Sequence, residues 1–148
     1  MNAHPYLRAY MAGITVPTMA LLLALTVFCI ARLGYHVPVP IERLLVFPMA
    51  IVPNLFGLWN ILYVRVGSGR RLPIGLHGAL LPFLVVPLAF TIASSLGFLT
   101  FGQEAFVLFD ALRIPYSRLA VIFPGTVVIY YLVWKHLVGF FNELLGIA

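Results

Sequence analysis

The sequence predicts an all-α fold, a polytopic transmembrane bundle of four helices with a short interfacial helix between the third and the fourth. Hydrophobic residues make up 63% of the 148 positions and charged residues only 9%, whereas a soluble domain is usually about half apolar and about a quarter charged. The mean hydropathy is +1.08. The nine basic and four acidic residues leave four long uncharged stretches between them. A soluble fold of this size could not bury so much apolar surface.

Each uncharged stretch predicts one membrane span. We expect the first helix at about Tyr10–Ala31 and the second at about Leu44–Val64. The third is expected at about Ile74–Phe101 and the fourth at about Leu119–Val138. A helix needs about 20 apolar residues to cross a hydrocarbon core of about 30 Å, and the first three stretches reach that length.

The fourth stretch leaves two alternatives for the end of its helix. It is interrupted at Lys135, about one turn too early for a full span. Either the lysine side chain extends to the headgroups, or the helix continues past it through Gly139 and Phe141.

The connection Gly102–Arg118 is predicted to carry a helix that lies in the membrane interface. Phe106, Phe109 and Leu112 recur in it at helical spacing, with polar residues elsewhere on the helical wheel. An amphipathic helix of this kind lies at the headgroup boundary. No connection is long enough for a separate domain, so residues 1–148 are expected to form a single transmembrane domain.

Prolines occur in every predicted span, and they predict kinked helices. Proline has no N–H group and leaves the carbonyl four residues earlier without its helical partner. In lipid such a carbonyl needs a partner inside the protein. The prolines inside the predicted spans are Pro17, Pro48, Pro53, Pro82, Pro87 and Pro124.

Loop charge predicts the orientation. With an even number of spans both termini lie on one side, and that side carries Arg8, Lys135 and the basic turn 65–71. Arginine and lysine are in excess in cytoplasmic loops, so we expect both termini in the cytoplasm, in a bacterial inner membrane. The basic residues sit singly at segment ends and form no basic patch, so no nucleic-acid partner is expected.

Two asparagines are the intramembrane polar candidates. Asn54 follows Pro53 near the middle of the second span and shares a face with Ala50 and Gly57. It either contacts a solute in a cavity opened by the kink or bonds to a neighbouring helix. Asn60 lies nearer the inner boundary and is expected to be structural.

His77 and His136 are the candidate cofactor ligands, because both are expected near the inner boundary. Paired histidines on neighbouring helices can hold a haem or a metal ion. Only His4 and Glu143, in the chain termini, are available to complete such a site. We therefore expect no metal and no cofactor.

Small residues form two stripes that would let helices approach each other closely. Ala89, Ala93 and Gly97 repeat every four residues on the third span, and Ala20 and Ala24 belong to a stripe on the first. Such stripes pack against another helix, either within the chain or in a partner subunit.

The predicted function follows from what the spans lack. No ionisable residue is expected near the bilayer centre, and no nucleophile is paired with a base, which argues against a proton-coupled pump and a hydrolytic enzyme. The favoured function is a non-catalytic subunit or scaffold of a larger membrane complex, in contact with lipid and with other membrane subunits or copies of itself. The alternative is a small oligomeric carrier or channel for an apolar or neutral solute, with Asn54 in its path. An enzyme acting on lipid or quinone through His77 and His136 is the third possibility.

Overall fold

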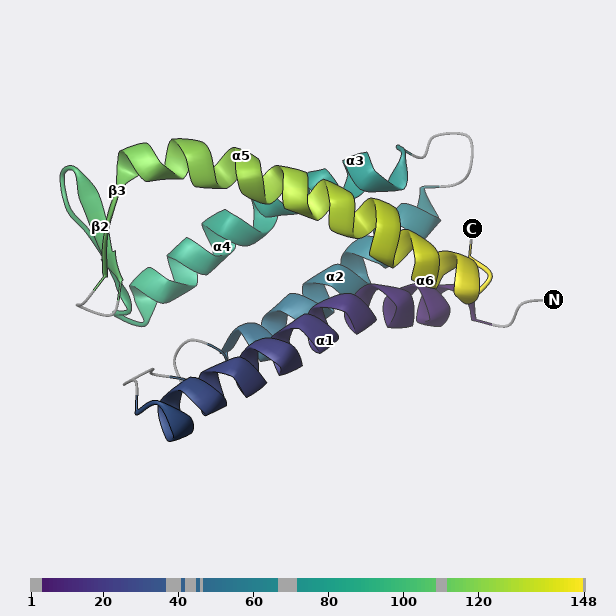
Figure 1. Ribbon diagram of the computed structural model, residues 1–148. Helices are drawn as coiled ribbons and strands as arrows, with labels where there is room; N and C mark the ends of the chain where they lie inside the picture. Colours follow the sequence, from purple (N-terminus) through teal and green to yellow (C-terminus); the bar gives the residue numbers. More distant parts are fainter. Residues whose placement is uncertain are drawn as a thin grey trace. The chain divides into compact units, whose positions relative to one another are not determined.

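The computed structural model is mostly helical and contains one small sheet (Figure 1). It describes residues 4–36, 41, 45, 47–66, 72–108 and 112–147. The chain divides into two compact units. Unit 1 comprises Met1–Arg71 and His136–Ala148, and unit 2 comprises Leu72–Lys135. Each unit is described by itself.

In unit 1 the long helix α1 (Pro5–Gly34) is followed by α2 (Phe47–Arg65). Pro5 occupies the first turn of α1, where its missing N–H costs nothing because that group has no helical partner anyway. Pro17 and Pro53 lie inside the two helices. Both helices agree with the predicted spans within a few residues, except that α1 begins one turn earlier than expected.

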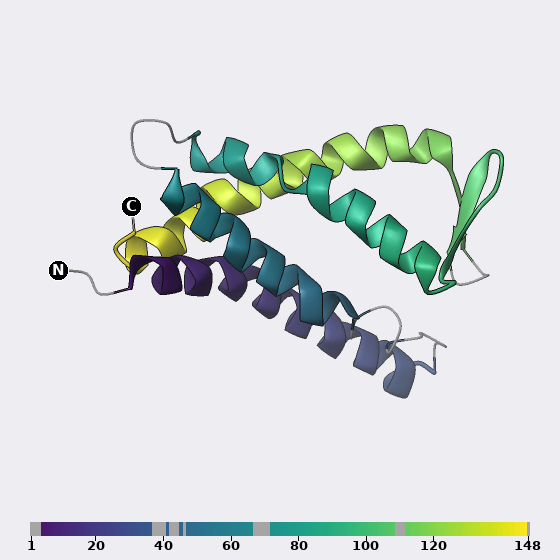
Figure 2. The same cartoon turned by 180° about the vertical axis from the view of Figure 1, so that it is seen from behind.

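Helices α1 and α2 lie side by side and run in opposite directions (Figures 1 and 2). They come close together at two glycines, Gly13 and Gly57. A Cβ atom added to Gly13 would lie 2.6 Å from the carbonyl oxygen of Phe56 and 2.8 Å from the Cα atom of Gly57. Only glycine fits such a distance, so Gly13 sets the spacing of the pair.

In unit 2 the predicted third span, Ile74–Phe101, is broken into α3 (Ile74–Ala79) and α4 (Pro82–Ser95). The helix is therefore interrupted at one of the predicted prolines, and Ile74–Ser95 as a whole is still long and apolar enough to cross a membrane. Pro82 cannot donate to the carbonyl of Gly78, and the N–H of Leu81 bonds to that carbonyl instead, at 3.0 Å. This tighter bond across three residues replaces the helical one and breaks the span.

The end of α4 also differs from the prediction. The N–H of Phe98 bonds to the carbonyl of Ala93 at 2.8 Å, and the N–H of Gly97 bonds to that of Ser94 at 3.0 Å. These two bonds form a Schellman motif, with Gly97 at φ 73° in the left-handed position that glycine adopts most easily. The helix therefore ends at Ser95 and does not continue to Phe101.

The predicted interfacial helix between the third and fourth spans is wrong as well. Its place is taken by an antiparallel sheet of β1 (Leu99–Phe101), β2 (Ala105–Leu108) and β3 (Leu112–Pro115), in the order β1-β2-β3. An isolated helix of two turns is marginal, whereas paired strands bond to each other's backbone. Phe109 lies outside the described residues.

The last helical segment is longer than predicted. It runs through α5 (Tyr116–Leu132), the π-helix η2 (Val133–Val138) and α6 (Gly139–Leu144). The helix therefore continues past Lys135 through Gly139 and Phe141, which confirms the second of the two alternatives.

Three helical segments among the described residues are long and apolar enough to cross a membrane. They are Pro5–Gly34, Ile74–Ser95 and Tyr116–Leu144. Large apolar side chains on these segments are exposed, including Leu23, Phe83 and Val121. This surface suits lipid and supports the predicted association with a membrane.

Candidate functional site

The most completely buried polar side chains that the structure describes belong to Asn60 on α2 and Asn142 on α6, which are 0% and 2% exposed. The Nδ2 of Asn60 donates to the Oδ1 of Asn142 at 2.7 Å, and the Nδ2 of Asn142 donates back to the Oδ1 of Asn60 at 3.1 Å. The Nδ2 of Asn60 also donates to the carbonyl of Ala9 on α1, at 2.8 Å. We call these three residues the asparagine clasp, since they join three helices of unit 1.

The clasp uses the full donor capacity of Asn60. A carboxamide has two N–H donors and one carbonyl acceptor. In Asn60 one donor serves Ala9, the other serves Asn142, and the acceptor receives a bond from Asn142. A buried amide satisfied in this way holds helices together and carries no nucleophile or titratable proton.

Small residues on α1 make the clasp possible. Ala9, Ala12, Gly13 and Pro17 are the buried residues of that helix, and they recur at helical spacing on one face. A larger side chain there would hold α2 too far away for Asn60 to reach the carbonyl of Ala9.

A second contact fastens α6 to the start of α1. The end of α6 forms another Schellman motif, in which Ile147 N–H bonds to the carbonyl of Asn142 at 2.8 Å and Gly146 lies at φ 64°. A Cβ atom on Gly146 would lie 3.0 Å from a guanidinium nitrogen of Arg8. A cation beside the carbonyl end of a helix is electrostatically favourable.

Asn54 bonds between helices. Its Oδ1 accepts a hydrogen bond from the Tyr10 hydroxyl on α1. Its Nδ2 donates to the carbonyl of Ala50, one turn earlier on α2, at 2.7 Å. Of the two expectations for Asn54, this geometry fits the contact with a neighbouring helix.

The stripes of small residues are placed differently from each other. Ala20 and Ala89 are exposed, and Ala24 and Ala93 are half-buried. Gly97 does not share their helical face, because α4 ends before it, and a Cβ atom added there would meet nothing within 4 Å. The packing roles of the four alanines stay predictions.

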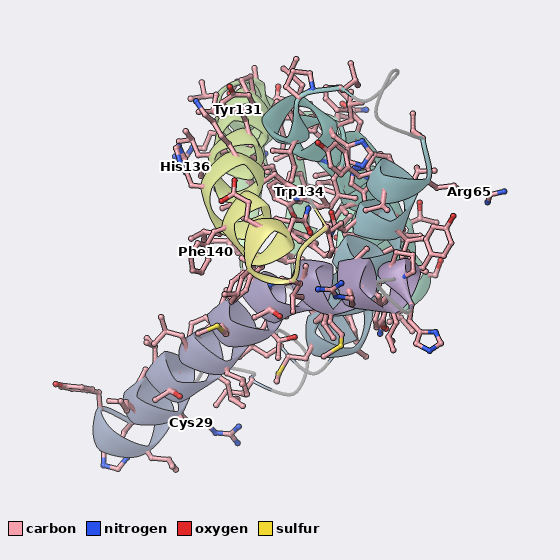
Figure 3. All side chains as sticks on the ribbon, turned by 90° about the vertical axis from the view of Figure 1, so that its right-hand side faces the viewer. Cys29, Arg65, Tyr131, Trp134, His136 and Phe140 are labelled. Carbon is pink, nitrogen blue, oxygen red and sulfur yellow. The ribbon has the colours of Figure 1, made fainter. Side chains whose placement is uncertain are left out.

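The two candidate ligand histidines lie in different units. His77 is buried in unit 2, where its ring meets the indole of Trp134 edge-on, with the centroids 5.7 Å apart. His136 is exposed on η2 and belongs to unit 1 (Figure 3). Across the part of the chain that the structure describes, no three His, Cys, Asp or Glu side chains gather in a way that could hold a metal ion.

Sequence reasoning missed a helix contact within unit 2. A Cβ atom on Gly75 of α3 would lie 2.7 Å from the ring of Tyr131, and one on Gly78 would overlap the Cβ and Cγ of Trp134. The signal was present as two glycines and two aromatics with the same three-residue spacing. Figure 3 labels both aromatic side chains on the last helical segment.

Sequence reasoning also missed Asn142, which it left in the chain terminus. The available signal in the sequence was its position four residues after Val138, which places the amide on the same helical face as an apolar side chain. Comparison of the chain with protein-family models, with curated proteins and with solved structures finds no significant match.

Proposed function

We propose that the protein is a non-catalytic subunit or scaffold of a larger membrane assembly. The observation that supports this most is the use of the buried amides in unit 1. Asn60 and Asn142 are bonded to each other and to the backbone of α1, and Asn54 is bonded to Tyr10. Amides bonded in this way hold helices together and are not free to act on a substrate, which suits a structural subunit.

The hydroxyl groups of the helices are used in the same manner. Each of six donates to the carbonyl of the residue four positions earlier, at 2.7 to 2.9 Å. Such bonds hide a polar group from lipid inside its own helix. The six are Thr15, Thr18, Thr26, Thr91, Ser95 and Thr126.

The proposal includes α2 as a fourth span of one transmembrane domain. Its 19 residues give a length of about 28 Å at 1.5 Å per residue, close to the thickness of a hydrocarbon core. Four spans place both termini on one side. The positive charge of the loops on that side favours the cytoplasm, and we propose a bacterial inner membrane as the location.

A subunit also needs a surface for its neighbours, and α5 offers one. No residue of α5 is buried in the structure. Val121, Val128 and Ile129 are all more than half exposed. In the proposed assembly this helix packs against a larger membrane protein on one side and lipid on the other.

The test is native mass spectrometry after extraction of membranes with a mild detergent, with the chain expressed at its natural level. We expect a complex of fixed stoichiometry with one or more larger membrane proteins. A photo-crosslinker at Val121, Val128 or Ile129 should reach the same protein. The matched control is a crosslinker at the fully buried Leu81, which should react only within the chain. A lone homo-oligomer that carries a solute across vesicles would overturn the proposal in favour of a carrier.

A further inference from the structure

The small sheet of unit 2 has one apolar face. Paired residues of neighbouring strands point to the same side of a sheet, and alternate residues share a side. The register pairs Leu99 with Leu108 and Leu108 with Leu112, and it pairs Phe101 with Phe106 and Phe106 with Ile114. All six of these side chains therefore lie on one face, which we call the apolar face.

The opposite face has a different character. Thr100 pairs with Val107, and Val107 pairs with Arg113, so a hydroxyl and a guanidinium flank an apolar residue there. The smaller Ala105 and Pro115 pair with each other at the end of the same face. Thr100 and Arg113 are both exposed. The three-stranded sheet is therefore amphipathic across its thickness.

The helices cover only part of the apolar face. Phe90 of α4 contacts Phe106 at 5.2 Å between ring centroids and stacks on Phe101 at 6.2 Å. Leu99 and Phe106 are buried, yet Phe101 remains 57% exposed and Leu112 55% exposed. Apolar side chains at two ends of this face thus lack a covering within the described chain.

The position of the sheet indicates what covers them. The sheet connects α4 to α5 and lies across the ends of both helices (Figure 1). These helices belong to two of the segments long enough to cross a membrane, Ile74–Ser95 and Tyr116–Leu144. The connection between the two spans therefore lies where they leave the hydrocarbon core.

We propose that the sheet is a membrane-surface element, with its apolar face on the acyl chains and its Arg113 face toward the headgroups and water. The outer strands β1 and β3 each have one edge unpaired within the sheet. Unpaired backbone groups are not tolerated in the hydrocarbon core but are hydrated at the interface, which fixes the depth of the sheet. The exposed guanidiniums of Arg113 and Arg118 suit the lipid phosphates. This inference requires the membrane spans but not the proposed role as a subunit.

The test compares neighbouring residues that point in opposite directions. The full chain carries one cysteine, so Cys29→Ser gives a cysteine-free parent. Single cysteines then replace Phe101, Thr100, Leu112 and Arg113 in turn and receive a nitroxide spin label. Each purified protein is reconstituted into vesicles of phosphatidylcholine and phosphatidylglycerol. Electron paramagnetic resonance measures the accessibility of the label to oxygen, which collects in lipid, and to a water-soluble nickel chelate.

We expect the ratio of oxygen to nickel accessibility to be high at 101 and 112 and low at 100 and 113. A label at Leu23, which is exposed near the middle of α1, supplies the reference value for lipid contact. All four positions are exposed, so the labels should leave the fold intact, and circular dichroism and gel filtration against the parent check this. Equal nickel accessibility at all four positions would overturn the proposal. So would shielding of 101 and 112 from both reagents, because that result means that protein covers the apolar face.

Discussion

Asn60 and Asn142 lie 82 positions apart in the chain and exchange two hydrogen bonds through their carboxamides. The exchange ties the last helix of the chain to α2, and the third bond to Ala9 ties both to α1. The clasp is therefore the first place at which to test how unit 1 is held together.

Replacing Asn142 with alanine should lower the free energy of unfolding by about 1–2 kcal/mol, because Asn60 keeps a buried acceptor and a donor without their partner. Unfolding in mixed detergent micelles with increasing sodium dodecyl sulfate, followed by circular dichroism, measures the change. Glu143→Ala, at the exposed neighbouring position, is the matched control and should be close to neutral.

The double variant Asn60→Ala/Asn142→Ala extends this test. Its loss of stability should be smaller than the sum of the two single losses, since each single variant leaves the other amide buried without its partner and the double variant leaves neither. Additive losses would mean that the two amides do not interact.

Gly13→Ala should lower the free energy of unfolding by about 1–3 kcal/mol, as overpacking does in a soluble core. The added methyl group would meet the backbone of α2 at Phe56 and Gly57, which cannot rotate away. Gly125→Ala is the control, because Gly125 also lies in a helix but a Cβ atom there meets nothing within 4 Å. If the two variants have the same melting temperature, α1 and α2 do not approach each other closely at Gly13.

The contact between α3 and α5 gives a prediction of compensation. Gly75→Ala should destabilise the protein, because the new methyl group meets the ring of Tyr131. In a Tyr131→Ala background the same substitution should cost little, since the ring is gone. Gly78→Ala should not be rescued by shortening Trp134 to alanine, because it overlaps the Cβ of that residue as well. Thermal unfolding of the four single variants and the two double variants distinguishes these outcomes.

Reporter fusions test the topology. Fusions after Gly69 and at the C-terminus should read cytoplasmic, and fusions near His36 and Glu104 should read external. The expectation near Glu104 also places the sheet on the outer surface. A cytoplasmic signal near Glu104 would require a different number of spans between Arg71 and Arg118.

The helices α1 and α2 and the last helical segment could be predicted from the uncharged stretches, because apolar length is what a membrane demands of a span. The ends and breaks could not. Hydropathy does not reveal the helical hydrogen bond that Pro82 cannot make, nor the positive φ that Gly97 adopts. Both residues are singled out from the sequence. The small-residue pattern assigns Gly97 to a packing stripe, whereas in the structure the backbone of Gly97 ends a helix.

The sheet and the asparagine clasp could not be predicted from the sequence for a different reason. Phe106 and Leu112 fit a helical spacing, yet the pairing of β2 with β1 and with β3 decides their conformation, and the spacing does not reveal that pairing. Asn60 is one of the polar candidates of the sequence, but its partner Asn142 is defined only once α6 packs against α1 and α2. Contacts between residues far apart in the chain are difficult to predict from a single sequence.

Substitutions at Gly97 test whether this residue is needed for its backbone conformation or for close helix packing. If the glycine is needed only for its left-handed conformation at the end of α4, Gly97→Ala and Gly97→Leu should lower the free energy of unfolding by a similar amount, about 1–2 kcal/mol. Gly97→Asn should cost less, because asparagine tolerates that conformation. If the residue instead packs against a neighbouring helix, the loss should grow with side-chain size, and asparagine should be worse than alanine. The order of the three variants in detergent unfolding, repeated in the native membrane complex, decides between the two roles.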